Sequence, residues 1–181
     1  MLNNNILEID ESLFTEEELN KLKAKKFSIY LTEESVKNKN KAKENYFITG
    51  AIGYIDNQKT CFIFAHGGED GSFQFSPLKS YYYEDLIKCL NGFYKYFLKH
   101  ENVYLNNLYK SLLIANEEDL PIFIHGCYDS AKNVNEFKRI KPLTKFGSSY
   151  SYAEAEYKII NNTKYIKFSI EEIKEEIWLR S

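Results

Sequence analysis

Two short runs of unbroken apolar sequence, each followed by a His-Gly pair, constrain the fold of this 181-residue chain most strongly. The first run, 61–65, precedes His66-Gly67, and the second, 121–124, precedes His125-Gly126-Cys127. Continuous apolar runs of this length are typical of central strands that are covered on both faces. Helical sequence long enough for a crossover separates the two runs, so they are predicted to be parallel strands of one sheet.

Weaker patterns predict the other elements. Apolar residues recur at three- and four-residue spacings over 83–100 and, less regularly, over 104–115, which is typical of helices. A hairpin is predicted over 46–65, because a polar tetrapeptide separates two apolar runs there. Capping-box spacings at 15–18 and 169–172 predict a helix over 15–25 and a terminal helix. Further strands are predicted over 27–31, 145–149, 157–160 and 165–168, with a turn at 161–162.

The composition predicts one folded domain over residues 1–181. Aromatic residues make up 16% of the chain, with 15 Tyr and 13 Phe, and they supply the buried area that a core needs. Residues 33–45 are almost wholly Lys, Asn and Glu and are predicted to form a loop. The order of the elements predicts an α/β fold, in the form of a three-layer α/β/α domain with a mostly parallel central sheet.

Charge and cysteine usage limit the classes of partner. The 24 basic and 26 acidic side chains nearly balance, which argues against a nucleic-acid binder. The first residues lack the pattern of a signal peptide, and no apolar run approaches the ~20 residues of a membrane span, so we expect a cytoplasmic protein without a membrane partner. Three cysteines, an odd number, indicate reduced thiols. No nucleotide-binding fingerprint is present, and no cofactor is predicted. The Lys- and Asn-rich composition is typical of an AT-rich bacterial or phage genome.

The predicted strand ends bring together two reactive side chains. Parallel neighbours lie ~4.8 Å apart and end at the same edge of a sheet, where ligands and catalytic groups collect. His66 and Cys127 are therefore predicted to lie within reach of each other, although 61 positions separate them. A cysteine thiolate is a nucleophile, and a histidine can stabilise it or protonate a departing amine. The backbone N–H groups of Gly67 and Cys127 are the candidates for an oxyanion hole.

The segments around these residues resemble caspase-like cysteine peptidases, a clan that includes caspases, clostripain, gingipains and the autoprocessing domains of clostridial and MARTX toxins. Residues 62–67, followed by Gly71-Ser72-Phe73, are similar to the strand and His-Gly motif of that clan. Residues 121–130 are similar to the strand that ends in its nucleophile. The resemblance covers about 60–160. It implies a caspase-like fold and a cysteine peptidase that cleaves a protein or peptide through an acyl-enzyme, with Cys127 and His66 as its dyad.

The resemblance extends to a substrate cleft. Residues 145–149, with Glu154 and Glu156 beyond them, are similar to the strand that lines the cleft in this clan. Four residues are implied as its lining: Ser148, Ser149, Tyr150 and Tyr152. Two features depart from the clan. Residues 26–65 do not form the two βα units that usually precede the histidine strand, and the segment around Cys127 lacks the Ala-Cys-Arg-Gly signature, so no aspartate-specific pocket is implied.

Other interpretations of the same residues stay open. An inactive member of the clan would keep the fold and use its cleft to bind a protein or peptide partner. A zinc site is the chemical alternative, with ligands drawn from His66, His125, Cys127, Asp70 and Asp129.

Structural roles compete with chemical ones at three positions. Cys61 and Cys89 lie within apolar patterns and are predicted to be core residues. His125 is either a structural histidine or a residue that tunes the thiol of Cys127 from the same face of the strand.

Overall fold

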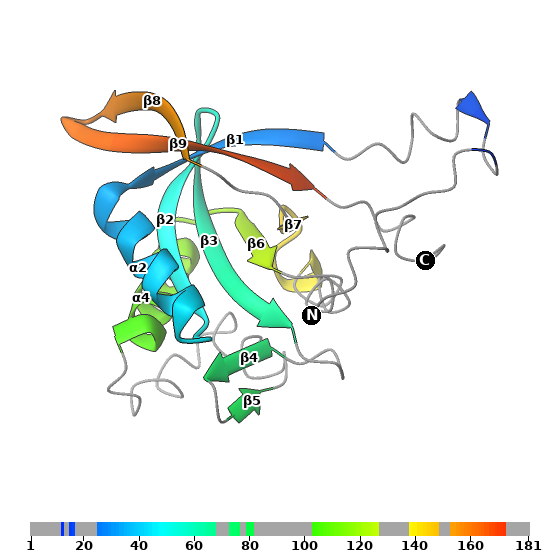
Figure 1. Cartoon of the computed structure of the whole chain (residues 1–181), viewed down its shortest axis with the longest axis vertical. Helices are drawn as coiled ribbons and strands as arrows, with labels where there is room; N and C mark the ends of the chain where they lie inside the picture. Colours follow the sequence, from blue (N-terminus) through cyan, green and yellow to red (C-terminus); the bar gives the residue numbers. More distant parts are fainter. Residues whose placement is uncertain are drawn as a thin grey trace.

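The computed structural model describes residues 12, 15–16, 25–67, 73–76, 79–81, 103–126, 138–148 and 153–172 (Figure 1). The helices predicted over 15–25 and 83–100 therefore lie outside the described residues, apart from the ends of the first segment. The elements follow in the order β1 (Lys25–Thr32), α2 (Glu33–Glu44), β2 (Thr49–Ile55), β3 (Gln58–Gly67), β4 (Phe73–Ser76), β5 (Lys79–Tyr81), α4 (Val103–Glu117), β6 (Ile122–Gly126), β7 (Lys145–Ser148), β8 (Ala153–Ile160) and β9 (Thr163–Glu172).

All nine of these strands belong to one mixed sheet, in which antiparallel pairs prevail. Only β3–β6 and β6–β7 pair in parallel among the described strands. The α/β class is confirmed, but the prediction of a mostly parallel central sheet is wrong. Short turns cause part of the difference, because two-residue connections join β2 to β3 and β8 to β9 as hairpins. The long antiparallel pairing of β1 with β9 accounts for much of the rest.

The pairings also close a ring. β2 pairs with β3 along its whole length and with β1 near its end, at Ile29↔Ile55 and Tyr30↔Tyr54. From β3 the pairing continues through β6, β7 and β9 back to β1. Six strands (β1, β2, β3, β6, β7 and β9) therefore surround a common interior, as in a small barrel filled by its own side chains.

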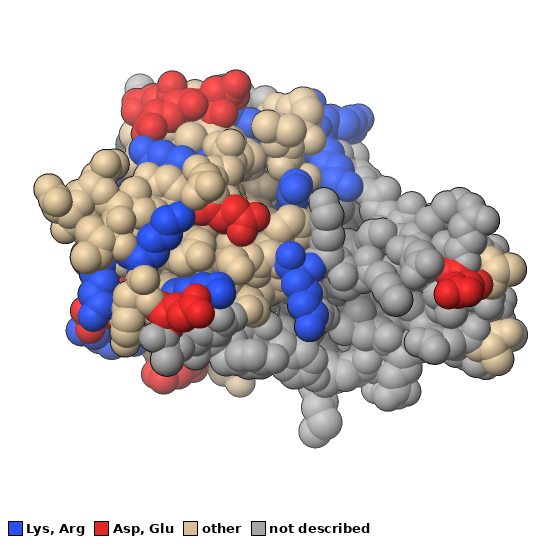
Figure 2. Space-filling model, turned by 90° about the horizontal axis from the view of Figure 1, so that it is seen from above, with Lys and Arg blue, Asp and Glu red and all other residues tan. Residues whose placement is uncertain are grey.

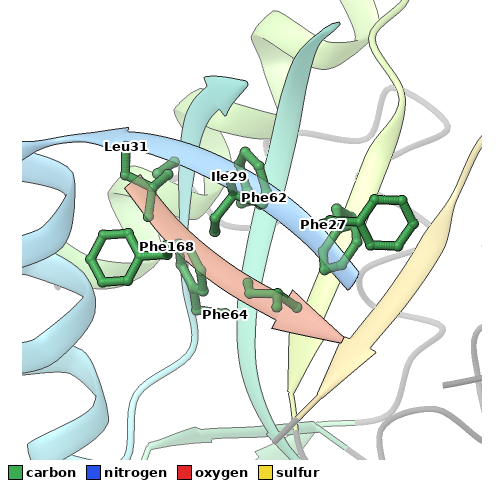
Figure 3. Close-up of a cluster of buried hydrophobic side chains, with 9 residues drawn as sticks. Phe27, Ile29, Leu31, Phe62, Phe64 and Phe168 are labelled. Carbon is green, nitrogen blue, oxygen red and sulfur yellow. The ribbon is translucent and has the colours of Figure 1, made fainter. Parts of the chain in front are cut away.

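Aromatic and aliphatic side chains fill this interior. Phe62 of β3 and Phe123 of β6 are fully buried, and their ring centroids lie 5.9 Å apart. Figure 3 shows the strands β1 and β9 crossing over β3, with labelled side chains of all three strands gathered at the crossing. Each large side chain buried in this way contributes about 1.5–3 kcal/mol to stability. The cluster consists of Phe27, Ile29, Leu31, Ala51, Phe62, Phe64, Phe123, Phe168 and Ile170.

The two described helices cover opposite faces of β2. A Cβ atom on Gly50 would lie 3.0–3.2 Å from Leu108 and Ser111, so α4 packs tightly against that face. The next residue, Ala51, points to the other face and belongs to the core cluster. On that side Val36 of α2 packs against the cluster. No helix in the described parts of the chain has the length and apolar character that crossing a membrane requires.

Two local predictions are wrong. Residues 33–45 are not a loop, because Glu33–Glu44 forms α2. Thr32 caps this helix by accepting a hydrogen bond from the backbone N–H of Ser35 at 3.2 Å, and Lys and Glu are good helix formers. Residues 169–172 do not begin a helix but complete β9, where they pair with β1 from Lys25 to Ser28. Tertiary pairing outweighs the capping-box pattern there.

Several other local predictions are confirmed. The 46–65 hairpin forms as β2 and β3, with Asp56 at a positive φ of 50° in the turn. The turn at Asn161 and Asn162 also forms, with φ values of 49° and 64° that asparagine tolerates well. Strands occupy the segments expected at 27–31, 157–160 and 165–168, and α4 covers the helix expected at 104–115. β7 covers most of the strand expected at 145–149.

Candidate active site

The candidate site lies at the edge of the sheet where β3, β6 and β7 end. As the sequence predicts, β3 and β6 are parallel neighbours, and they pair from Cys61↔Ile122 to Ala65↔Gly126. β7 continues the parallel arrangement on the far side of β6, with His125 opposite Gly147. The carboxyl ends of three adjacent strands therefore meet at one edge of the sheet (Figure 1).

The structure places the backbone of one member of the predicted dyad. His66 and Gly67 are the last residues of β3, and their backbones pair with Gln74 and Phe73 of β4. β4 therefore lies beside Gly67, the predicted oxyanion-hole residue. Cys127 directly follows β6 in the sequence and lies outside the described residues. The strands that carry the dyad are thus adjacent, while the contact between the two side chains stays a prediction.

His125 occupies a defined place on this edge. Its half-buried ring meets the ring of Phe64 edge-to-face, with centroids 5.7 Å apart. Burial lowers the pKa of His125 to about 3, and the positive charges of Lys39 and Lys43 add to this effect. The imidazole is therefore neutral at physiological pH. A neutral ring cannot stabilise a thiolate by its charge, which favours the structural interpretation of His125.

Lys39 is a candidate functional residue that sequence reasoning missed. It is only 8% exposed, and its Nζ lies 4.6 Å from the ring centroid of Phe168 and 5.6 Å from that of Phe64. Such a cation–π arrangement offsets part of the cost of burying the ammonium group. Burial still lowers the pKa of Lys39 to about 8, with a smaller contribution from the charge of Lys43. A signal was present in the sequence, because Lys39 follows the core-facing Val36 at helical spacing.

The predicted cleft residues are only partly described. Ser148 is the last residue of β7, and its backbone pairs with Glu171 of β9. Ser149, Tyr150 and Tyr152 lie outside the described residues. The structure therefore brings the start of the predicted cleft segment next to β6, on the side away from β3.

Cys61 is a core residue, as predicted. It is fully buried, and burial raises the pKa of its thiol to about 12, so it is not a nucleophile near neutral pH. Cys89, the second predicted core cysteine, lies outside the described residues.

The zinc interpretation gains no support from the described residues. They contain no cluster of three or more His, Cys, Asp or Glu side chains that could hold a metal ion. Of its proposed ligands, Asp70, Cys127 and Asp129 lie outside them.

Comparison of the chain with protein-family models, curated proteins and solved structures found no match.

Proposed function

We propose that this protein is a cysteine peptidase that uses Cys127 and His66. The thiolate of Cys127 attacks the carbonyl carbon of a peptide bond, and the N–H groups of Gly67 and Cys127 bind the developing oxyanion. The His66 imidazolium then protonates the departing amine as the C–N bond breaks. Water, deprotonated by His66, hydrolyses the thioester and releases the acid, which regenerates the thiol.

One observation carries this proposal. Every paired residue of β6 stands 61 positions after its partner in β3, from Cys61↔Ile122 to Ala65↔Gly126. Cys127 stands 61 positions after His66, so the next pair in the same register would join these two residues. Positions paired across parallel strands lie ~4.8 Å apart, which is within reach of a thiol–imidazole hydrogen bond. The proposal requires that the register extends by this one step.

Local electrostatics add support. The positive charges of Lys39 and Lys43, which lower the pKa of His125, would also favour a thiolate near the end of β6. Because His125 is neutral at neutral pH, it is a poor proton donor, and we assign that role to His66. The resemblance to caspase-like peptidases supports the same pair.

A three-layer caspase-like fold is part of the proposal for the whole chain. Helices on both faces of β2 support it, since α4 packs on one face and α2 covers the core on the other. The prevalence of antiparallel pairs and the closed ring of six strands depart from the open, mostly parallel sheet of that fold. This departure favours the second candidate function, an inactive module that binds a protein or peptide partner at the same edge.

Selective alkylation tests the proposal. The protein is treated with iodoacetamide over a series of mildly acidic to neutral pH values, and the modified cysteines are mapped by mass spectrometry. We expect Cys127 to react first, and His66→Ala to shift its reaction to higher pH. His125→Gln is the matched control, because it removes an imidazole from the same edge and should leave the reactivity of Cys127 nearly unchanged. Buried Cys61 serves as an internal unreactive standard.

Cleavage of a mixed peptide library measures activity directly. The wild-type protein is expected to cut peptides, and Cys127→Ser should abolish the cleavage. If Cys127 reacts no faster than an ordinary thiol and no peptide is cut, the proposed peptidase function is wrong. The binding module is then the better account.

A further inference from the structure

The outer edge of β8 is a second surface of interest, and it is independent of the proposed active site. β8 pairs with β9 and with no other strand in the described parts of the chain. The hairpin that they form projects at the upper left of Figure 1. Its regular part pairs Tyr157↔Ile166 through Ile160↔Thr163 around the two-residue turn.

The hairpin geometry decides which backbone groups face outward. In a hairpin with a two-residue turn, the residues flanking the turn, here Ile160 and Thr163, exchange hydrogen bonds with each other. Bonded and non-bonded pairs then alternate along the ladder. The backbone N–H and C=O groups of Tyr157 and Ile159 therefore point away from β9, toward the open edge.

The same two residues expose their apolar side chains. Ile159 is 74% exposed and Tyr157 is 59% exposed, and Ile159 is the most exposed large hydrophobic residue in the described segments. Natural edge strands usually avoid exposing apolar side chains beside unpaired backbone groups, because that combination recruits another strand. Figure 2 shows basic and acidic side chains interspersed among uncharged residues on the surface seen from above. On β8 itself Glu156 and Lys158 flank Tyr157, so the charges of a partner strand distinguish one register from another.

We infer that β8 pairs with β8 of a second copy of this chain, in an antiparallel arrangement centred on Tyr157. Pairing of outward-facing residues with one another allows registers centred on Glu156, Tyr157, Lys158 or Ile159, and the last of these places Lys158 opposite Ile160, without an opposite charge. The first places two Glu156 side chains opposite each other, and the third places two Lys158 side chains opposite each other. Only the register centred on Tyr157 places Glu156 opposite Lys158, and twofold symmetry makes this pair twice.

Existing contacts prepare this edge for pairing. Glu156 accepts a hydrogen bond from Lys167 at 3.0 Å, and Lys158 donates one to Asn57 at 3.0 Å, so both charged side chains are already held by neighbours. The Lys164 ammonium lies 3.9 Å from the ring centroid of Tyr157. A register shift between Ala153 and Tyr157 limits the regular edge to a few residues. The predicted interface is therefore small, and because interfaces of limited area are weak, we expect the dimer to dissociate readily.

Charge exchange tests the register. Sedimentation velocity over a concentration series should show wild-type dimerisation. Glu156→Lys and Lys158→Glu should each weaken the dimer about tenfold, because each turns two attractive pairs into repulsive ones. The double variant, with both charges exchanged, should return to near wild-type affinity. Glu117→Lys is the matched control: it makes the same change of charge at an exposed position of α4, outside β8, and should leave the affinity almost unchanged.

Cross-linking gives a second, independent readout. Residues in a hydrogen-bonded antiparallel pair have Cα atoms about 5.5 Å apart, a separation that suits a disulfide. In a background with Cys89→Ser and Cys127→Ser, Tyr157→Cys should form a disulfide-linked dimer on mild oxidation. Ile159→Cys should do so far less. Circular dichroism checks that each variant is folded.

Two results would overturn the inference. One is a wild-type chain that stays monomeric at the highest attainable concentration. The other is a folded double variant that fails to recover dimerisation while both single variants have lost it.

Discussion

At the scale of single residues, burial and charge act together on His125. Its pKa of about 3 in the folded protein lies below its ordinary value of 6.5. Between these values the unfolded chain binds more protons than the folded one, so stability rises with pH. The stability that neutral His125 contributes is fully present above about pH 6.5. It is lost as the pH falls toward 3, by up to about 1.4 kcal/mol in the free energy of unfolding per pH unit.

His125→Phe should remove this pH dependence, because phenylalanine fills a similar volume beside Phe64 and does not titrate. Urea unfolding at pH 7 and at several lower values measures the difference. We expect the wild-type protein to lose more stability on acidification than the variant, with ionised carboxylates contributing equally to both. Equal losses in the two proteins would mean that His125 is hydrated and protonates normally.

The close approach of β2 to β1 requires a glycine at position 53. A Cβ atom at this position would lie 2.3 Å from the backbone oxygen of Tyr30 and 2.9 Å from the side chain of Leu31. A backbone oxygen cannot rotate away, so Gly53→Ala must push β1 and β2 apart. We expect a loss of about 3 kcal/mol in the free energy of unfolding.

Gly50→Ala is the matched control for Gly53. The added methyl group meets Leu108 and Ser111 at 3.0–3.2 Å, a contact that a small shift of α4 relieves. We expect this variant to lose about 1 kcal/mol. Denaturant unfolding of both variants at one pH makes the comparison. Similar losses at the two positions would contradict the tight contact between β1 and β2.

At the scale of elements, α2 depends on its N-terminal cap. Thr32 Oγ1 accepts the backbone N–H of Ser35 and also donates to the Ser35 hydroxyl at 2.9 Å. Thr32→Ala should lower the free energy of unfolding by about 1 kcal/mol, whereas Thr32→Ser should keep most of it. Hydrogen exchange at the Ser35 amide should accelerate in the alanine variant only. Identical exchange in both variants would show that the cap does not hold this end of the helix.

The same helix shows where sequence reasoning falls short. The polar composition of 33–45 led to the wrong prediction of a loop, although Lys and Glu favour helices. The apolar face of α2 is narrow, with Val36 and Ala42, and therefore gives only a weak helical pattern. The strands were easier to predict, since apolar runs and turn residues indicate β2, β3 and the end of β8. The partner of β9 was not predictable, because its pairing with β1 joins residues more than a hundred positions apart.

Of the candidate site, the sequence predicted the arrangement of the two strands that carry it. Apolar runs that end in His-Gly indicated the parallel pair β3 and β6, and the structure confirms that these two strands pair in parallel. The position of Lys39 beside Phe64 depends on how α2 crosses the sheet, and no local pattern encodes that crossing. The meeting of the two strand ends was therefore predictable and the crossing of the helix that carries Lys39 was not, while the contact between His66 and Cys127 stays a prediction.

At the scale of the whole molecule, the ring of six strands joins segments from both ends of the described chain. Phe123 of β6 meets Phe27 of β1 edge-to-face across the interior, with centroids 5.9 Å apart. It also contacts Phe62 of β3 at the same centroid distance. One core therefore holds the elements on both sides of the ring, and we expect these elements to unfold as a unit.

Phe123→Ala tests this cooperativity. Deleting a fully buried ring should lower the free energy of unfolding by about 3–5 kcal/mol. Hydrogen exchange followed by mass spectrometry locates the effect. In a closed ring, the most protected amides of β1 and β9 should accelerate by the same factor as those of β6, because all of them exchange through global unfolding. Val103→Ala, at an exposed position of α4, is the control and should change none of these rates. Acceleration confined to β6 and its neighbours would show that β1 and β9 form a separate unit, and that the short β1–β2 and β7–β9 pairings do not transmit stability around the ring.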